Sequence, residues 1–255
     1  MKNITSGLLL ATALSSAFPA TAASAQETVL GPIIVSAGLS PLAQKEMGRS
    51  FTVVNAEQIE RTKPAYVADI LRQVPGISVS PSGSAGGLTQ VRMRGAEANH
   101  VLVMIDGVPA LDNASGEFDF GRLQAGDIER VEVLRGPQSA FWGSDALAGV
   151  INIITKSGAR NGFGTTVATE LGTDGTKMGS VQVDYGQDNF DIRGSVTARH
   201  TDGFNISSFG SELDGATHFD ANLKFNAQVT PTLTVDGALR YGFFHADSDD
   251  QIWPD

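Results

Sequence analysis

From about Asn161 onward, the chain alternates apolar and polar residues in runs of about ten. In MGSVQVDYG, for example, Val181, Val183 and Tyr185 fall on one side of the run and the polar residues on the other. Because successive side chains of a β-strand point to opposite faces, such runs predict strands with one apolar and one polar face. Turn sequences such as GTDGT and GQDN separate the runs, which predicts an antiparallel meander.

Two architectures fit this alternation, a soluble β-sandwich and a transmembrane β-barrel. The polar face carries charges at strand centres, which suits a wet or plugged lumen. Aromatic residues gather near strand ends, as in the aromatic girdle of a barrel, and include Tyr185, Tyr241, Phe243 and Phe244. We therefore expect antiparallel transmembrane β-barrel strands in this part of the chain.

The preceding hundred or so residues mix helix and strand signals, which predicts an α+β domain. Asn55 and Gln58 have the spacing of a capping box, and Pro64 is placed as a first-turn residue of a second helix. Asp106-Gly107 interrupts an apolar run and predicts a tight hairpin. The stretch RVEVLRGPQSAFWGSDALAGVINIITK predicts two strands joined across a glycine-rich bend.

Composition excludes several classes of function. The 255 residues carry a net charge of −10, which argues against nucleic acid as a partner, and the absence of cysteine excludes thiolate chemistry. The sequence contains no GxSxG, HExxH or GxxxxGK[ST] motif, and its histidines are scattered. We therefore expect no enzyme activity.

The first 25 residues are typical of a secretory signal peptide. Lys2 precedes the apolar run GLLLATALSSAF, and small residues ending in Ala23-Ser24-Ala25 follow. A membrane anchor or a buried helix is the alternative, but the run is short for a membrane span. We expect export, with a mature chain that begins near Gln26.

Four stretches resemble the TonB-dependent outer-membrane receptors, in that family's order and spacing: GPIIVSAG, ADILRQVPGISV, RMRGAEANHVLVMIDGVP and ERVEVLRGPQSAFWGSDALAGVINIITK. The second half of the third stretch and the end of the fourth look most like the cobalamin receptors. The resemblance implies an α+β plug inside a 22-stranded barrel. It divides the chain into a signal peptide (1–25), a TonB-box segment and linker (26–49), the plug domain (50–157) and the amino-terminal, truncated part of the barrel (158–255).

The resemblance also implies a partner, TonB with its inner-membrane energising complex. The segment that matches the TonB box consists of Ile33, Ile34, Val35, Ser36 and Ala37. An extended, β-branched, unpaired strand suits edge-to-edge pairing with a partner's sheet. An ordinary strand paired within the plug is the alternative for these residues.

Charged residues of the plug form a second candidate site. We expect a network that holds the plug against the barrel wall yet can be released, formed by Arg92, Arg94, Glu129, Glu132 and Arg135. The alternative is a set of solvated charges, each contributing little to stability.

The resemblance implies that plug loops which face outward contact the ligand. The two candidate loops are PSGSAGG and PALDNASGEF. The residues expected to contact ligand are Ser82, Gly83, Ser84, Leu111, Asp112 and Asn113. The acidic end of the chain offers Asp247, Asp249 and Asp250 as hard oxygen ligands for calcium. A solvated acidic loop is the alternative there, and the sequence requires no other cofactor.

The resemblance implies energised uptake of a scarce nutrient across the outer membrane, in contact with its lipid. Cobalamin is the expected ligand, and a ferric siderophore or haem is the alternative. About 95 residues follow Asn161, enough for five or six strands, so we expect a fragment of a receptor. A secreted plug-like binding module without transport is the alternative of another class, and the reading frame beyond codon 255 distinguishes the two.

Overall fold

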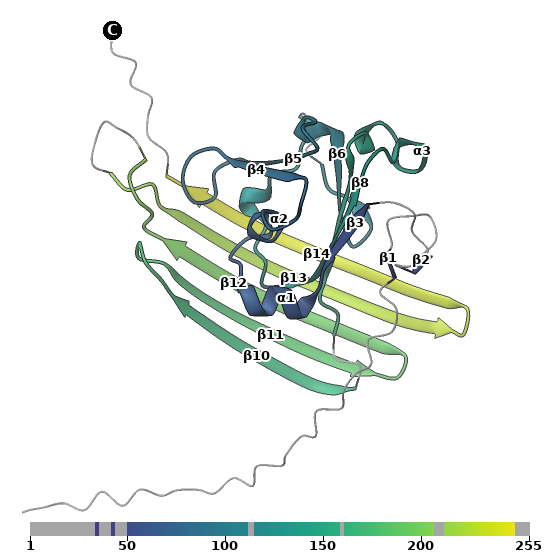
Figure 1. The fold of residues 1–255 in the computed structure, drawn as a ribbon. Helices are drawn as coiled ribbons and strands as arrows, with labels where there is room; N and C mark the ends of the chain where they lie inside the picture. Colours follow the sequence, from purple (N-terminus) through teal and green to yellow (C-terminus); the bar gives the residue numbers. More distant parts are fainter. Residues whose placement is uncertain are drawn as a thin grey trace, which may run out of the picture. The chain divides into compact units, whose positions relative to one another are not determined.

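The computed structural model describes residues 34–35, 42–43, 50–111, 115–158, 161–206 and 212–247. An α+β region (residues 50–158) is followed by a strand region (residues 161–247), drawn from blue to teal and from green to yellow in Figure 1. The α+β region contains β3 (Phe51–Val54), α1 (Ala56–Thr62), α2 (Val67–Leu71), β4 (Ile77–Pro81), β5 (Thr89–Met93), η2 (Ala98–His100), β6 (Val101–Ile105), β7 (Val108–Pro109), η3 (Phe120–Arg122), β8 (Ile128–Arg135), α3 (Ser139–Trp142), η4 (Ser144–Ala146) and β9 (Gly149–Thr155). The strand region contains β10 (Gly162–Leu171), β11 (Lys177–Gln187), β12 (Phe190–Thr201), β13 (Ala216–Thr230) and β14 (Leu233–Ala246).

The α+β region is built on a mixed five-stranded sheet of order β3-β8-β9-β6-β7. β8 and β9 pair antiparallel, which confirms the two strands predicted on either side of the glycine-rich bend. β6 and β9 pair in parallel, and all other neighbours are antiparallel. Gly149 opens β9, and a Cβ there would lie 2.2 Å from the Leu134 carbonyl oxygen, so the sheet closes only around glycine.

The turn between β6 and β7 is the tight hairpin that Asp106-Gly107 predicts. Both residues have positive φ, 51° and 80°, as a two-residue hairpin with the favoured twist requires. The backbone N–H of Asp106 also donates to the carbonyl of Ile153 on the neighbouring β9. The hairpin is therefore tied to the centre of the sheet.

The helices pack against this sheet. Asn55 and Gln58 form the predicted capping box of α1, with side chain to backbone hydrogen bonds of 3.0 and 3.1 Å. The prediction that Pro64 lies in the first turn of the second helix is wrong, because α2 begins at Val67. The preceding residue, Tyr66, is held extended by a bridge to Gln124. Tertiary pairing thus shortens a helix that local signals make longer.

The core of the α+β region is a cluster of apolar side chains. It lies between the sheet and α1, α2 and η3, and its fully buried side chains include Ile70, Leu71, Met93, Phe120, Val131, Ile151 and Ile153. Among the residues described, no helix is long and apolar enough to span a membrane.

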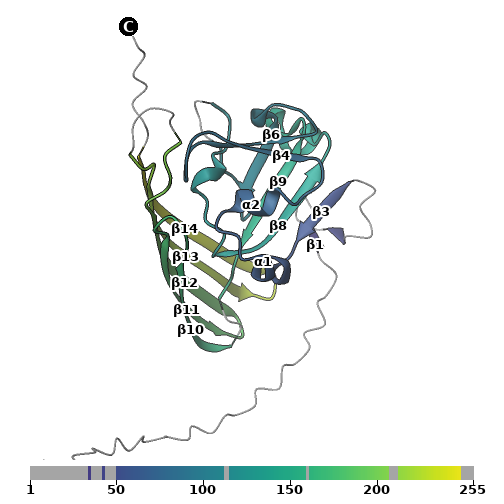
Figure 2. The ribbon, with the colours of Figure 1, turned by 60° about the vertical axis from the view of Figure 1, so that its left-hand side comes forward.

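The strand region is an antiparallel meander in which each strand pairs with the next, in the order β10-β11-β12-β13-β14. Figures 1 and 2 show it as one continuous curved sheet. The predicted alternation is clearest in the burial of β11 and β12. The apolar side chains are exposed, whereas their polar neighbours Arg193, Ser195, Arg199 and His218 are buried.

Candidate ligand site and contacts of the strand region

The polar face of the strand region is most buried on β12, where residues of the α+β region contact it. Arg193 on β12 is 6% exposed and forms the centre of one contact. Its Nε donates to Asp127 of the α+β region at 3.0 Å, and its Nη1 donates to Asp184 on β11 at 2.6 Å. Its Nη2 donates to the amide oxygen of Gln182 at 2.6 Å. We call these four residues the Arg193 cluster, in which one cation joins a carboxylate of each region.

A second contact centres on Asp106, in the hairpin between β6 and β7. Its carboxylate accepts from the backbone and side chain of Thr155, the last residue of β9, at 2.9 and 2.7 Å. It also pairs with Lys224 of β13 at 3.0 Å and with Arg240 of β14. Burial alone raises the pKa of this carboxyl, but the Thr155 hydrogen bonds and the Lys224 ammonium outweigh it, so the pKa of Asp106 is lowered. We call Asp106, Thr155, Lys224 and Arg240 the Asp106 cluster.

Aromatic groups form a third contact. Tyr66 Oη and His218 Nε2 lie 3.3 Å apart, and the His218 ring packs on Phe244 with centroids 4.5 Å apart. The guanidinium of Arg122 lies over the Phe244 ring, 4.9 Å from its centroid. A Cβ at Gly86, which has φ of +79°, would lie 2.3 Å from the Phe244 ring. The loop from Pro81 to Gly87 therefore lies directly against β13 and β14.

A cavity of about 200 Å³ lies beside this loop. It is lined from the α+β region by Tyr66 and Ala85, and from the strand region by Asp174, Thr176, Arg199, Thr201, Gly203 and Phe204. Burial raises the pKa of Tyr66 and the nearby Arg199 guanidinium opposes this shift, so the phenol is neutral at physiological pH. Hydroxyl groups and a guanidinium thus line a small space suited to a polar ligand group.

The predicted ligand residues divide around this cavity. Ser82, Gly83 and Ser84 lie in the loop that includes Ala85, and a Cβ at Gly83 would touch Ile206 beyond β12. Leu111 instead packs against a small apolar cluster near β6. Asp112 and Asn113 lie outside the described residues. The ligand role of both loops stays a prediction, and of the six residues the three in the first loop lie in the segment that borders this cavity.

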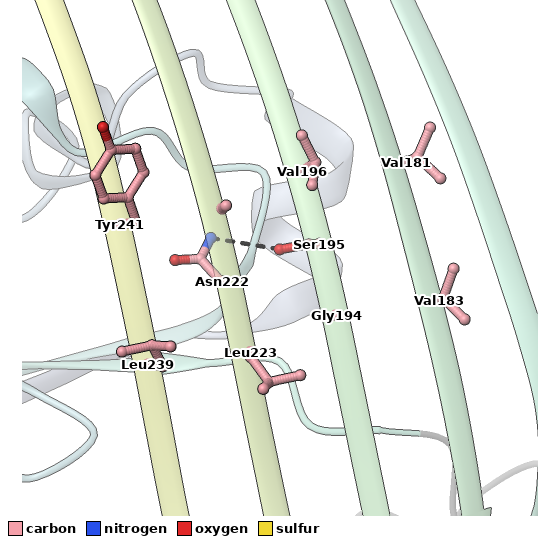
Figure 3. Close-up of a pocket in the computed structure, with 10 residues that line it drawn as sticks. Val181, Val183, Gly194, Ser195, Val196, Asn222, Leu223, Leu239 and Tyr241 are labelled. Carbon is pink, nitrogen blue, oxygen red and sulfur yellow. Dashed lines mark hydrogen bonds between the residues drawn. The ribbon is translucent and has the colours of Figure 1, made fainter.

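A larger cavity, of about 380 Å³, opens on the opposite, apolar face of the strand region (Figure 3). Val181, Val183, Leu223, Leu239 and Tyr241 border it, around Gly194 and Ala221. The hydrogen bond between Asn222 and Ser195 lies behind this face. The groove is thus part of an apolar surface and lacks the polar groups that orient a ligand.

The charge network expected at Arg92, Arg94, Glu129, Glu132 and Arg135 stays a prediction, and the structure gives the following contacts for these residues. Arg92 donates to Ser80 and Gln90 and lies 3.9 Å from Glu97. Glu129 and Glu132 flank Arg130. All of these partners lie in the α+β region.

Arg135 also turns inward to its own sheet, because β8 pairs with β3. It donates to Ser50 and Thr52 at 3.0 and 2.8 Å. Arg94 has φ of 54° in the turn after β5, and burial together with this second guanidinium lowers the pKa of Arg135. Contact with β10–β14 is instead made by the Arg193 and Asp106 clusters.

Sequence reasoning identified none of the residues in these two clusters as a site, although it placed Asp184 and Arg193 on the polar face of their strands. An inward charge at a strand centre was the available signal. Its partner could not be found from sequence, because Asp127 and Arg193 are 66 residues apart and meet only in the folded chain.

Two further predictions concern the ends of the chain. The backbone of β1 (Ile34–Val35) pairs antiparallel with β2 (Leu42–Ala43), so the strand expected to be unpaired has a partner in its own chain. Ile33, Ser36 and Ala37 lie outside the described residues, as do Asp249 and Asp250. Asp247 lies 3.4 Å from His245, and among the residues described no group of three or more acidic or histidine side chains is placed to hold a metal ion.

Known proteins show the same two parts. Residues 43–150 match the family described as the TonB-dependent Receptor Plug Domain. The vitamin B12 transporter BtuB of Vibrio vulnificus (strain CMCP6) is 41% identical over 145 residues, covering 57% of this chain and 24% of that protein.

Solved structures share the fold of both regions. The siderophore receptor PirA of Acinetobacter baumannii aligns with a TM-score of 0.62 and 25% identity, over 77% of this chain and 31% of that one. The ferripyoverdine receptor of the outer membrane of Pseudomonas aeruginosa aligns with a TM-score of 0.69 and 19% identity, over 83% of this chain and 27% of that one. The chain thus spans about a quarter to a third of the length of these relatives.

The family match covers most of the α+β region, and the structural matches extend over the antiparallel strands that follow it. The relatives are outer-membrane proteins, and the apolar outer face of β10–β14 fits that location. The chain therefore resembles the TonB-dependent receptors of the outer membrane, and residues 43–150, which make up most of its α+β region, match their plug domain.

Proposed function

We propose that this chain serves energised uptake of a scarce nutrient through the outer membrane, with cobalamin as the ligand. The observation that carries the choice of ligand is the 41% identity to the vitamin B12 transporter BtuB, which includes the plug. In this proposal the signal peptide is 1–25, the TonB-binding segment lies in 26–49, the plug is 50–157 and the barrel strands lie in 158–255.

A ferric siderophore is the second candidate ligand. The solved structures with similar folds include the siderophore receptor PirA at 25% identity. The sequence relative favours cobalamin because its identity to this chain is higher, 41% against 25%. Equilibrium binding of cyanocobalamin and of ferric enterobactin to the purified receptor that carries this sequence distinguishes the two ligands.

Energy coupling is the second part of the proposal. The plug is held to β12, β13 and β14 by the Arg193 and Asp106 clusters, both of which a pulling force must break to open a path. We assign the attachment point for TonB to Ile33–Ala37. The β1 and β2 pair forms a two-stranded sheet, which supports this segment's ability to take an extended, pairing conformation.

Replacing Ile34 with proline tests the coupling. Proline removes a backbone donor, so strand pairing with TonB is lost. Cells that produce the Ile34→Pro receptor should bind labelled cyanocobalamin at the surface as wild type does but should not accumulate it. Ile34→Val, which keeps a β-branched side chain, is the matched control and should retain uptake. Wild-type uptake by the proline variant would remove the TonB-box assignment.

A further inference from the structure

Arg199 stands out among the residues that line the cavity of about 200 Å³. It lies on β12 and is 7% exposed. Its Nη2 donates to Glu170 at 3.0 Å, whereas its Nε is buried without a hydrogen-bond partner among the residues that the structure describes. Leaving a buried donor of a charged group unpaired is costly, so this N–H requires an explanation.

The other polar groups around the cavity already have partners. Thr176 donates to Thr201 at 3.0 Å, and Thr201 donates to the backbone carbonyl of Asp174, also at 3.0 Å. Tyr66 is hydrogen bonded to His218. Glu170 is the acceptor for Nη2. Among the described residues that line the cavity, none accepts a hydrogen bond from the Arg199 Nε.

The size of the cavity limits what could supply that oxygen. Complete small-molecule ligands occupy pockets of about 300–1,000 Å³, which is more than this space offers. One arm of a larger ligand fits, with the rest of the molecule outside. Arginine suits such an arm because its planar guanidinium fixes the direction of each donated hydrogen bond.

We infer that Arg199 determines ligand specificity by donating from Nε to an oxygen of one ligand arm, a carboxylate or an amide carbonyl, that enters the cavity beside Tyr66 and Ala85. This inference rests on the proposed uptake function and adds to it the residue and the chemistry of recognition. Cobalamin carries amide arms and ferric siderophores carry oxygen acceptors, so both candidate ligands offer the required group.

The test uses equilibrium binding to the purified receptor that carries this sequence. The ligands are cyanocobalamin, its monocarboxylate derivatives, in which one amide arm is hydrolysed, and ferric enterobactin. The variants are Arg199→Gln, which removes the charge, and Arg199→Lys, which keeps the charge toward Glu170 but lacks the Nε donor. The matched control is His200→Gln, the next residue of β12, which is half-exposed on the opposite face.

Arg199→Gln should weaken binding of the cognate ligand about 10- to 100-fold, the range expected for hydrogen bonds to a charged group. Arg199→Lys should also weaken it, and carries the test alone if the glutamine variant does not fold. His200→Gln should bind as wild type does. If cobalamin binds, the ratio of wild-type to Arg199→Lys affinity should differ between cyanocobalamin and the monocarboxylate whose altered arm enters the cavity. A purely structural role of Arg199 would give the same ratio for both ligands.

Different results would contradict the role of Arg199 and the proposed choice of ligands. Equal binding by wild type and both Arg199 variants would overturn the inference, and an ordered water would then be the acceptor for the Nε. The uptake proposal would not be affected. A wild-type receptor that binds none of these ligands overturns the proposed choice of ligands and this inference with it.

Discussion

The plug sheet and the strand region differ in which side chains they bury. The plug sheet buries its apolar side chains, whereas β10–β14 expose theirs. In the plug sheet, Val131, Val133 and Ile151 are fully buried against helices, so the apolar side chains face inward. In β10–β14 the apolar side chains face outward, and Val167 and Leu239 are more than 60% exposed. A plug is surrounded by water and polar barrel wall, whereas the outer face of a barrel is surrounded by lipid.

This difference has a consequence at the boundary of the two regions. Two apolar faces would hold the plug against the wall in many positions. This is because the free energy of burying apolar surface is roughly proportional to the buried area and does not depend on orientation. The boundary instead contains directional polar contacts, in the Arg193 and Asp106 clusters, beside the aromatic contact around His218. Such contacts hold one position and lose their stabilisation together when they are displaced.

The largest expected effect comes from removing the centre of one contact. Arg193→Met leaves the largely buried carboxylates of Asp127 and Asp184 without their shared cation and should destabilise the receptor by about 3–5 kcal/mol. The thermal unfolding midpoint of the purified receptor measures this effect. Arg72→Met is the control, because its partner Asp69 is on the surface of the plug and the pair contributes about 1 kcal/mol or less.

A third variant separates charge from packing at the same place. Combining Arg193→Met with Asp127→Asn and Asp184→Asn removes the uncompensated carboxylates and should recover part of the lost stability. If the single and triple variants unfold at the same temperature, side-chain packing and not ion pairing stabilises the Arg193 cluster. The boundary between the plug and the strand region would then not differ from the apolar core in the way proposed here.

The next largest effect is expected from arginine placed on one face of β10 and not on the other. Val167 and Thr166 are neighbours on β10, and only Val167 lies on the outward apolar face. Val167→Arg should destabilise the inserted receptor by about 2–4 kcal/mol because arginine then faces hydrocarbon, whereas Thr166→Arg should be tolerated. The fraction of folded receptor in outer membranes measures the difference. Equal yields of the two variants would contradict the assignment of faces.

The smallest effect is a dependence on pH at the Asp106 cluster. Because folding lowers the pKa of Asp106, its carboxylate stabilises the fold above the ordinary value of 3.8, and this contribution is lost as the pH falls through the lowered pKa. Asp106→Asn should therefore cost about 1–3 kcal/mol at neutral pH and progressively less in acid. Unfolding midpoints of both proteins between pH 7 and pH 3 test this, and a gap that does not narrow over this range would exclude the carboxylate as its source.

Local and periodic features of the fold were predictable from sequence. The capping box at Asn55, the Asp106-Gly107 hairpin and the faces of β11–β14 each depend on neighbours within a few residues, and each was confirmed. The start of α2 was not, since Tyr66 is held extended by Gln124, which lies in a distant part of the chain. Distant contacts override local preference wherever the two compete.

The candidate site was less predictable for the same reason. The loop containing Ser82, Gly83 and Ser84 was identified by resemblance, and it does lie beside a polar cavity. Arg199 appeared in the sequence only as one of several inward charges. What distinguishes it is an unpaired Nε, a property of its surroundings that appears only when the sheet and plug are assembled.

The position of β3 determines how the plug responds to mechanical load. β3 lies at one edge of the plug sheet and forms only four paired positions with β8, from Phe51 to Val54. The Asp106 cluster instead lies at β6 and the end of β9, toward the other side of the sheet. A load applied at Ser50 therefore reaches the short edge ladder before it reaches these polar contacts. We therefore expect β3 to separate from β8 at a lower force than the one that breaks the contacts with β10–β14.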